Sequence, residues 1–236
     1  MRGQRLGDAS TQTHAPAPRR ALSPIANNGG EGKIIVWPPS RLRLLAVGRL
    51  SYFKGFDVLL RALAQVPDAS LVLIGDGECG ENLRRLANEL GIADRVNFAG
   101  RIDMDARGEA RLADAYARCD VFCLPSTERA ESFGLVLLEA MRAGKPTIAS
   151  DIPGSGVGFV ARDGETGILV APDNVDALVG AIQHLNTDAG LRQRLGEAGR
   201  LRWQREFTLE QTTQKILALY REVLEASHHD TTRPEA

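Results

Sequence analysis

Short apolar runs alternate along this chain with longer segments in which apolar residues recur at helical spacing. Each run is only a few residues long, which suits a buried strand, and most of them end at a glycine or a proline. The runs lie at residues 44–47, 71–74, 96–99, 121–124, 147–149 and 168–170. Helical spacing is found at residues 56–66, 81–90, 109–118, 133–143, 175–185, 191–206 and 209–224. Strands that alternate with helices predict an α/β fold, a Rossmann-like parallel sheet flanked by helices.

The segment 131–146 stands apart from the other helical segments. Residues 135–138 are all apolar, and Gly144 is a typical helix end. A helix that is apolar all round is predicted to be buried. Glu139 lies inside this helix, where a carboxylate is costly unless a partner pairs with it. The segment therefore predicts a buried helix that carries one carboxylate with a special role.

The start of the same helix predicts an anion-binding site. Free backbone N–H groups and the helix dipole favour a phosphate there. Helical side chains tilt toward the N-terminus, so Glu139 is expected to reach toward Gly134, with Glu131 on the loop before it. A nucleotide sugar would fit this site, with its phosphate at the helix start and its hydroxyls at the carboxylates. The alternative is a buried helix whose Glu139 pairs with an arginine elsewhere in the chain.

Polar residues and glycines follow several other predicted strands. The carboxyl ends of parallel strands meet at one edge of the sheet, where ligands of such folds bind. Arg49 and Lys54 offer two cations to a diphosphate. In isolation a solvated surface is the favoured interpretation of both residues, but their place on the same edge as the Glu131 helix favours the functional one. Gly75 and Asp76 fit either a ligand loop or a plain turn. Residues at this predicted edge are Gly48, Arg49, Gly75, Asp76, Gly100, Arg101, Ser126 and Glu131.

At Glu131 and Glu139 the chain resembles a known family. The frame E-S-F-G-L-V-L-L-E-A-M-R-A-G-K-P is similar to the E-x7-E pattern of retaining glycosyltransferases of family 4, the group 1 glycosyltransferases. The resemblance covers residues 42 to 226 and implies one half of the two-domain GT-B fold, the donor-binding half. Residues 151–156 depart from the usual D-x-G-G-x-x-E pattern, because the glutamate is absent. This variant resembles a subset that includes bacterial mannosyltransferases of surface-polysaccharide synthesis.

The resemblance implies an enzyme, a retaining hexosyltransferase of polysaccharide biosynthesis. It implies transfer of a hexose from a nucleotide diphosphate sugar to a glycan or lipid-linked acceptor, with GDP-mannose as the first expected donor. Glu131 would hold the sugar and Glu139 the ribose. Arg49 and Lys54 would neutralise the leaving diphosphate, so the candidate catalytic residues are Glu131, Arg49 and Lys54. The candidate donor-binding residues are Glu139, Ser132, Phe133, Gly134, Leu135, Gly48, Gly75, Asp76 and Arg101.

Arg101 would stack on the base by resemblance, but a solvated surface arginine is an equal alternative. No D-x-D motif stands where it would replace the Arg49 and Lys54 cations, so we expect no metal and no cofactor.

The domain organisation follows from the same resemblance. Residues 1–40 are predicted to be a disordered leader, 41–207 the nucleotide-sugar-binding domain, 208–226 a helix that crosses back toward the other half, and 227–236 a disordered tail. The acceptor-binding half of the family is not recognisable in the chain. Two alternatives to an enzyme are therefore a donor-binding subunit that docks a separate acceptor-domain chain, and a truncated remnant without activity of its own.

The composition indicates which classes of binding partner and which cellular location to expect. The formal net charge is −1, which favours neither nucleic acid nor an anionic membrane as a partner. No apolar run approaches the ~20 residues of a transmembrane helix. The cysteines, Cys79, Cys119 and Cys123, do not resemble a disulfide framework. We therefore expect a cytoplasmic protein, either free or peripheral at the inner membrane.

Overall fold

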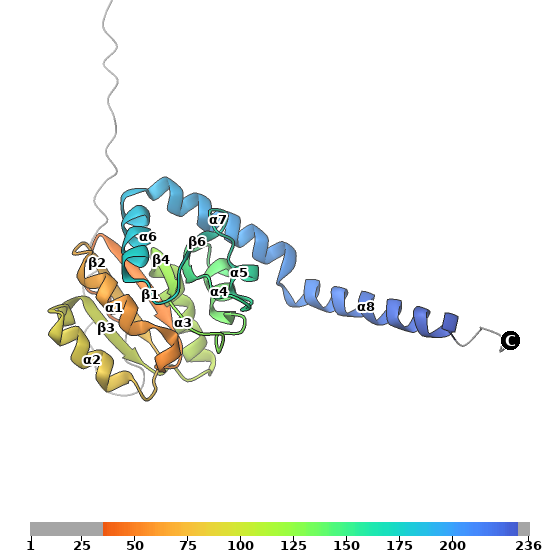
Figure 1. Cartoon of the computed structure of the whole chain (residues 1–236), viewed down its shortest axis with the longest axis horizontal. Coiled ribbons are helices and arrows are strands. Elements are labelled where there is room, and N and C mark those ends of the chain that lie inside the picture. Colours follow the sequence, from red (N-terminus) through yellow and green to blue (C-terminus); the bar gives the residue numbers. More distant parts are fainter. Residues whose placement is uncertain (1–34, 231–236) are drawn as a thin grey trace, which may run out of the picture. The chain divides into compact units, whose positions relative to one another are not determined.

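The computed structural model of the chain describes residues 35–230, with side chains described as far as residue 225. Residues 1–34 of the predicted leader and residues 231–236 of the predicted tail lie outside this part, whereas residues 227–230 of the predicted tail are helical. All six predicted strands are present and form one parallel sheet (Figure 1). They are β1 (Leu42–Val47), β2 (Ala69–Ile74), β3 (Val96–Gly100), β4 (Val121–Leu124), β5 (Thr147–Ser150) and β6 (Gly167–Val170). The predicted α/β fold class is confirmed.

The order of the strands in the sheet is β3-β2-β1-β4-β5-β6. The chain therefore builds outward from β1 in one direction as far as β3, and then returns to the other side of β1 with β4. In this Rossmann-like order, the connections leaving β1 and β4 go to opposite sides, which opens a crevice at their carboxyl ends. Ligands of open parallel sheets bind at such a switch point.

Helices cover both faces of the sheet. The first face carries α1 (Phe56–Ala64), α2 (Gly80–Glu89) and α6 (Val175–Thr187), packed on the inward side chains of the strands in one apolar cluster. The second face carries α3 (Ala106–Arg118), α4 (Leu135–Arg142) and α5 (Val157–Val160) in a second cluster (Figure 1). The remaining helices are α7 (Ala189–Glu206), α8 (Leu209–Asp230) and the short 3-10 turns η1 (Tyr52–Lys54) and η2 (Ala93–Arg95).

Side-chain caps set the starts of two helices earlier than apolar spacing predicted. The Asp105 side chain accepts a hydrogen bond from the Gly108 N–H at 2.7 Å, so α3 begins at Ala106 rather than at residue 109. The Asp188 side chain accepts one from the Leu191 N–H at 2.8 Å, so α7 begins at Ala189 rather than at residue 191. Capping satisfies backbone donors that apolar periodicity cannot detect.

Residues 35–37, part of the predicted leader, pack against the domain. They form no strand. Ile35 is buried in the second apolar cluster, and Trp37 packs against the same cluster. The Asn97 side-chain amide donates to the Val36 carbonyl at 2.6 Å. Apolar side chains and one hydrogen bond to the edge strand β3 therefore hold this segment in place.

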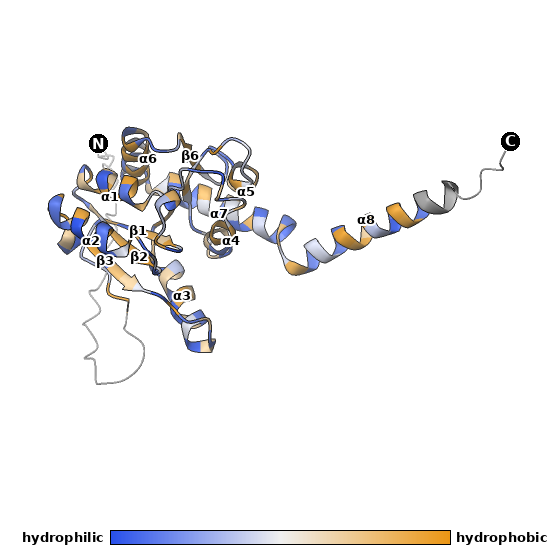
Figure 2. Ribbon diagram, turned by 60° about the horizontal axis from the view of Figure 1, so that its bottom comes forward, coloured by the Kyte–Doolittle hydropathy of each residue, from blue (hydrophilic) through white to orange (hydrophobic). Residues whose placement is uncertain are grey.

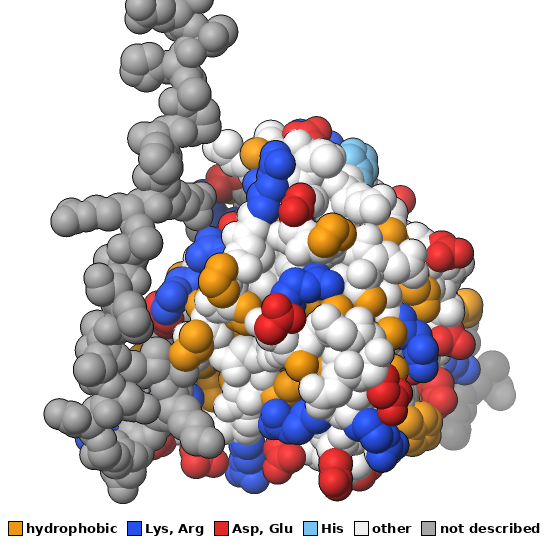
Figure 3. All heavy atoms as spheres, turned by 90° about the vertical axis from the view of Figure 1, so that its left-hand side faces the viewer, with side chains coloured by type: hydrophobic (Ala, Val, Ile, Leu, Met, Phe, Trp, Pro, Cys, Tyr) orange, Lys and Arg blue, Asp and Glu red, His pale blue; other side chains and the backbone are white. Residues whose placement is uncertain are grey.

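The surface is mixed in character. On the face that Figure 3 shows, basic and acidic side chains are interspersed, which agrees with the net charge of −1. Helix α8 alternates polar and apolar residues, and its large apolar side chains are exposed (Figure 2). Among the described residues, no helix has the length and apolar character needed to cross a bilayer.

Candidate functional site

The loops that follow β1 and β4 are tied together at the switch point. The Thr127 N–H donates to the Phe53 carbonyl at 2.8 Å. Gly55 adopts φ 62°, and a Cβ atom on it would lie 2.1 Å from the Pro125 carbonyl oxygen. Only glycine fits this left-handed, crowded position. The Lys54-Gly55 pair therefore brings the lysine directly against the loop that carries Glu131.

Lys54 and Glu131 form an ion pair across this junction. The Lys54 Nζ lies 2.6 Å from Glu131 Oε2, and the side chains are only 14% and 9% exposed. The Ser126 hydroxyl donates to the same carboxylate oxygen at 2.9 Å. Among the described residues, Glu131 Oε1 accepts no hydrogen bond. One carboxylate oxygen is thus fixed, and the other is left for a further donor.

The backbone of the Glu131 loop is braced by the segment that departs from the family pattern. The Gly156 N–H donates to the Ser132 carbonyl at 2.7 Å, and the Ser155 hydroxyl donates to the Glu131 carbonyl. A Cβ atom on Gly156 would lie 2.9 Å from both the Ser132 oxygen and the Phe133 ring. Helix α5, which the sequence did not predict, begins directly after this segment. Ser155 and Gly156 thus each fix the loop through one hydrogen bond.

Helix α4 begins where the sequence predicted an anion site. Gly134 is the N-cap at φ 76°, and a Cβ atom there would lie 2.9 Å from side-chain atoms of Leu124 and Leu137. Leu137 is buried, but Leu135 is 67% exposed at the sheet edge. The prediction that this helix is buried all round is therefore wrong for its first turn. In this turn the Leu137 N–H donates to the Gly134 carbonyl at 2.8 Å, whereas the N–H groups of Leu135 and Val136 have no acceptor among the described residues, and such free donors at a helix start suit an anion.

Glu139 is paired with a tyrosine and not with an arginine. The Tyr116 hydroxyl, from α3, donates to Glu139 Oε2 at 2.7 Å. Burial of the ring, together with the nearby Glu139 charge, raises the pKa of Tyr116 above its ordinary value, so the hydroxyl keeps its proton. Sequence reasoning missed Tyr116. The available signal was a tyrosine on the core-facing side of a helix, whose hydroxyl needs a partner when buried.

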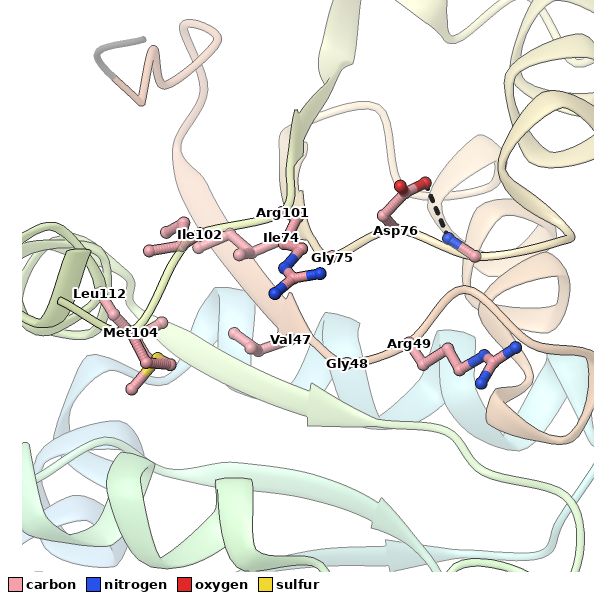
Figure 4. A pocket seen from close by; sticks show the side chains of 11 residues that line it. Val47, Gly48, Arg49, Ile74, Gly75, Asp76, Arg101, Ile102, Met104 and Leu112 are labelled. Carbon is pink, nitrogen blue, oxygen red and sulfur yellow. Dashed lines mark hydrogen bonds between the residues drawn. The ribbon is translucent and has the colours of Figure 1, made fainter. Parts of the chain in front are cut away.

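A cavity of about 440 Å³ opens beside these groups, lined by the loops after β1, β2 and β3 and by α3. Figure 4 shows apolar Ile102, Met104 and Leu112 at one end and Arg49 and Asp76 at the other. A nucleotide has the same polarity, since its base is largely apolar on both faces and its phosphates are charged. The lining contains the predicted donor-binding residues Gly48, Gly75, Asp76 and Arg101, and also Arg49, a predicted catalytic residue.

The exposed arginines of this edge have carboxylate neighbours. Arg49 Nε lies 3.2 Å from Glu78 Oε2, with side chains 74% and 51% exposed. Arg101 Nε lies 3.4 Å from Asp103 Oδ1, also in solvent. Such pairs contribute little to stability, so both guanidinium groups are free to turn toward a ligand. Sequence reasoning found neither Glu78 nor Asp103.

Two turn residues complete the lining. The Asp76 side chain accepts the Gly77 N–H at 2.8 Å, which is the plain-turn interpretation of that loop. A Cβ atom on Gly75 would lie 1.8 Å from the Gly48 carbonyl oxygen, so the loops after β1 and β2 touch there.

The predicted site residues thus fall into two groups. Lys54 and Glu131 meet at the switch point, beside the start of α4 with Ser132, Phe133, Gly134 and Leu135. The glycine loops and arginines line the cavity, and Lys54, Glu131 and Glu139 are not in that lining. Leu112 in the cavity wall and Tyr116 on Glu139 both come from α3, which connects the cavity to the α4 helix.

A six-stranded parallel sheet with this strand order and helices on both faces defines a Rossmann-like α/β domain. The sequence profile of the family "Glycosyl transferases group 1" matches residues 32–202. The chain therefore belongs to the group 1 glycosyltransferases.

Curated relatives support the family assignment. The lipopolysaccharide core biosynthesis glycosyltransferase LpsE of Rhizobium meliloti is 33% identical over 208 residues, which are 85% of this chain and 58% of that protein. The D-inositol 3-phosphate glycosyltransferase of Mycobacterium tuberculosis is 36% identical over 185 residues, which are 75% of this chain and 36% of that protein. The chain thus spans only about a third to three fifths of the length of these relatives.

Solved structures share the fold. The sucrose-phosphate synthase of Thermosynechococcus elongatus superposes with a TM-score of 0.67 at 36% identity, covering 80% of this chain and 47% of that one. Anabaena HepE in complex with UDP-glucose superposes with a TM-score of 0.67 at 26% identity, covering 77% and 49%. The GT-B half-fold that the sequence implied is consistent with both.

Proposed function

We propose that this chain is the donor-binding half of a retaining hexosyltransferase, which transfers a sugar from a nucleotide diphosphate sugar to a glycan or lipid-linked acceptor. The observation that carries the proposal is the ion pair between Lys54 and Glu131 at the switch point, beside the start of α4 and the nucleotide-sized cavity. The LpsE relative acts in lipopolysaccharide core biosynthesis, which supports a role in polysaccharide synthesis.

The cavity suggests how the donor would lie. The base would occupy the apolar end between Ile102, Met104 and Leu112, with Arg101 at its rim. The diphosphate would then point toward Arg49 and the backbone N–H groups of the first α4 turn. In this orientation the ribose would lie between the two ends, near the wall formed by α3.

The ion pair between Lys54 and Glu131 would stay formed when the donor binds. An ammonium group has three donors, so Lys54 can hold Glu131 and a phosphate oxygen together. Glu131 Oε1, which accepts no hydrogen bond among the described residues, would accept a sugar hydroxyl. Catalysis by this half would be electrostatic: Lys54, Arg49 and the helix start stabilise charge on the departing diphosphate, and Glu131 positions the sugar. We propose that no metal ion takes part.

The donor has two candidates. GDP-mannose follows from the resemblance of residues 151–156 to the variant found in mannosyltransferases. UDP-glucose follows from HepE, whose solved complex contains this donor. Titration calorimetry of the chain with GDP-mannose, UDP-glucose and UDP-N-acetylglucosamine distinguishes them. Absence of binding to every nucleotide sugar, and to UDP and GDP, would exclude the proposed function.

The acceptor would be bound by a second half, since the matched part of this chain covers only 58% and 36% of the two relatives. That half would come from further sequence or from a separate acceptor-domain chain, in which case this chain is a donor-binding subunit. Assay of sugar transfer and donor hydrolysis by the chain alone tests the two possibilities. The cytoplasmic location expected from the three cysteines, which are free thiols, stays a prediction.

A further inference from the structure

The hydrogen bond between Tyr116 and Glu139 indicates a functional role for Tyr116, a residue that belongs to none of the sequence motifs. Tyr116 is only 3% exposed, and its ring packs against Phe122 with centroids 5.4 Å apart. The same apolar cluster contains Leu137 and Ala140 of α4. Packing on all sides fixes the ring, so the position of its hydroxyl is set by the core and not by the ligand.

The Tyr116 hydroxyl acts as a permanent donor toward one carboxylate oxygen. It has a single hydrogen, and Glu139 Oε2 at 2.7 Å is a closer and stronger acceptor than the Val136 carbonyl at 3.3 Å. The raised pKa of Tyr116 keeps that hydrogen in place across the physiological pH range. A charge-assisted bond of this length holds the carboxylate in one orientation.

Glu139 is thereby left with one oxygen for other donors. Among the described residues, Glu139 Oε1 accepts no hydrogen bond. A carboxylate with one fixed oxygen cannot rotate freely, so the direction of the remaining oxygen is also set. Hydroxyl groups are suitable donors for it, and the proposed function supplies them on the ribose of the donor.

Helix α3 also joins this pair to the cavity. Leu112 lies one helical turn before Tyr116 on the same face of α3, and it lines the apolar end of the cavity. One rigid helix therefore both shapes the wall where the base would lie and holds the carboxylate that would meet the ribose. The distance between these two subsites is fixed by α3.

We propose that Tyr116 is a positioning residue, which orients Glu139 through Oε2 so that Oε1 reads the hydroxyl groups of the donor ribose. This inference rests on the proposed function, because it needs a nucleotide in the cavity. It predicts that the Tyr116 hydroxyl, which does not contact the ligand, affects the preference for a ribonucleotide over a nucleotide without ribose hydroxyls, in addition to the affinity for nucleotides in general.

The test compares Tyr116→Phe with the unsubstituted chain. Calorimetry measures dissociation constants for UDP and for 2′,3′-dideoxy-UDP, or for the GDP pair if GDP binds more tightly. Loss of a hydrogen bond to a charged group weakens binding about tenfold, so we expect the unsubstituted chain to prefer the ribonucleotide by about that factor. Tyr116→Phe should reduce this ratio about threefold or more, and Glu139→Gln should reduce it toward one. A merely structural role would weaken both nucleotides equally and leave the ratio unchanged.

Controls separate this inference from the proposed function. Tyr220→Phe, at an exposed position of α8, should leave the ratio intact. If Glu139→Gln lowers the ratio and Tyr116→Phe does not, the positioning role is wrong while the donor site stands. If nucleotides bind but Glu139→Gln also leaves the ratio unchanged, Glu139 does not read the ribose, and the inference fails with that assignment.

A second variant covers poor folding of Tyr116→Phe, which leaves the Glu139 charge without its donor. The double variant Tyr116→Phe/Glu139→Gln removes that charge as well. If Tyr116 acts only through Glu139, the double variant should show the same ratio as Glu139→Gln alone. A further fall in the ratio would mean that Tyr116 acts independently, and it would overturn the proposal.

Discussion

Lys54 and Glu131 are 77 residues apart in the chain, yet their side chains meet at 2.6 Å in a nearly buried ion pair. The pair joins the loops after β1 and β4, the two neighbouring strands whose connections leave in opposite directions. It therefore lies where this class of sheet binds its ligands.

The buried pair should show strong coupling in a double-mutant cycle. Removing one partner of a buried ion pair leaves an uncompensated charge, so Lys54→Met or Glu131→Gln should each lower the free energy of unfolding by about 3 kcal/mol. The decrease in the free energy of unfolding of the double variant should be smaller than the sum of the decreases of the two single variants. Urea unfolding measures these values. The matched control is the exposed pair, Arg49→Met and Glu78→Gln, for which we expect changes within about 0.5 kcal/mol.

Glu131→Gln should mainly affect discrimination between a nucleotide sugar and the free nucleoside diphosphate. The substitution removes the charge that would hold a sugar hydroxyl, while Lys54 and the α4 start remain for the phosphates. We expect the nucleotide sugar to lose about 1.5–3 kcal/mol of binding free energy and the free diphosphate to lose little. Calorimetry with both ligands checks this. An equal loss of binding free energy for the two ligands would show that Glu131 does not hold the sugar.

Nucleoside diphosphate binding should not require a divalent metal. Lys54, Arg49 and the backbone N–H groups at the start of α4 offer positive charge without one. We expect equal dissociation constants for UDP or GDP in the presence of magnesium and in the presence of a chelator. Loss of binding in chelator would show that a metal ion is needed.

Asp120 should contribute stability that acid removes. Burial opposes its charge, but hydrogen bonds from the Arg43 side chain and backbone outweigh that cost and lower the pKa of Asp120 below its ordinary value. The stabilisation from a lowered acid pKa is complete above the unfolded value, about 4, and is lost as the pH falls through the folded value.

Asp120→Asn should therefore lower the free energy of unfolding by about 2 kcal/mol at pH 7, and by progressively less below pH ~4. Urea unfolding across this pH range gives the difference. Asp114→Asn, in the exposed pair with Arg118, is the control and should have almost no effect. A difference for Asp120→Asn that persists unchanged at low pH would contradict the ionic explanation.

Helix α8 should cause the isolated chain to self-associate. Leu209, Ile216 and Val223 are exposed at intervals of seven residues. An antiparallel second copy would align Leu209 of one chain with Val223 of the other, and Ile216 with Ile216. We expect light scattering to show association that increases with concentration and disappears in Ile216→Glu/Val223→Glu. Gln211→Glu/Gln214→Glu adds the same charge at polar positions and should still associate, and a monomeric parent chain would contradict the prediction.

The sequence by itself determined the elements and the fold class. Apolar runs and helical spacing depend on local residues, so all six strands could be located from them, and the glycines before and after α4 marked its ends. The loop residues after each strand could be assigned to one sheet edge, because every strand of a parallel sheet ends there. Helix starts were less accurate where a side-chain cap such as Asp105 set them.

Only the tertiary structure decided which charged groups are partners. The sequence placed Lys54 and Glu131 on one edge, but their contact depends on β1 and β4 being neighbours, which local pattern does not encode. Glu139 needed a partner, and the core packing of α3 against α4 supplied Tyr116 where an arginine had been the alternative. Apolar periodicity is a property of the local sequence, so the fold could be predicted from it. The contacts between side chains of the site depend on which strands are neighbours in the sheet, so they could not be predicted.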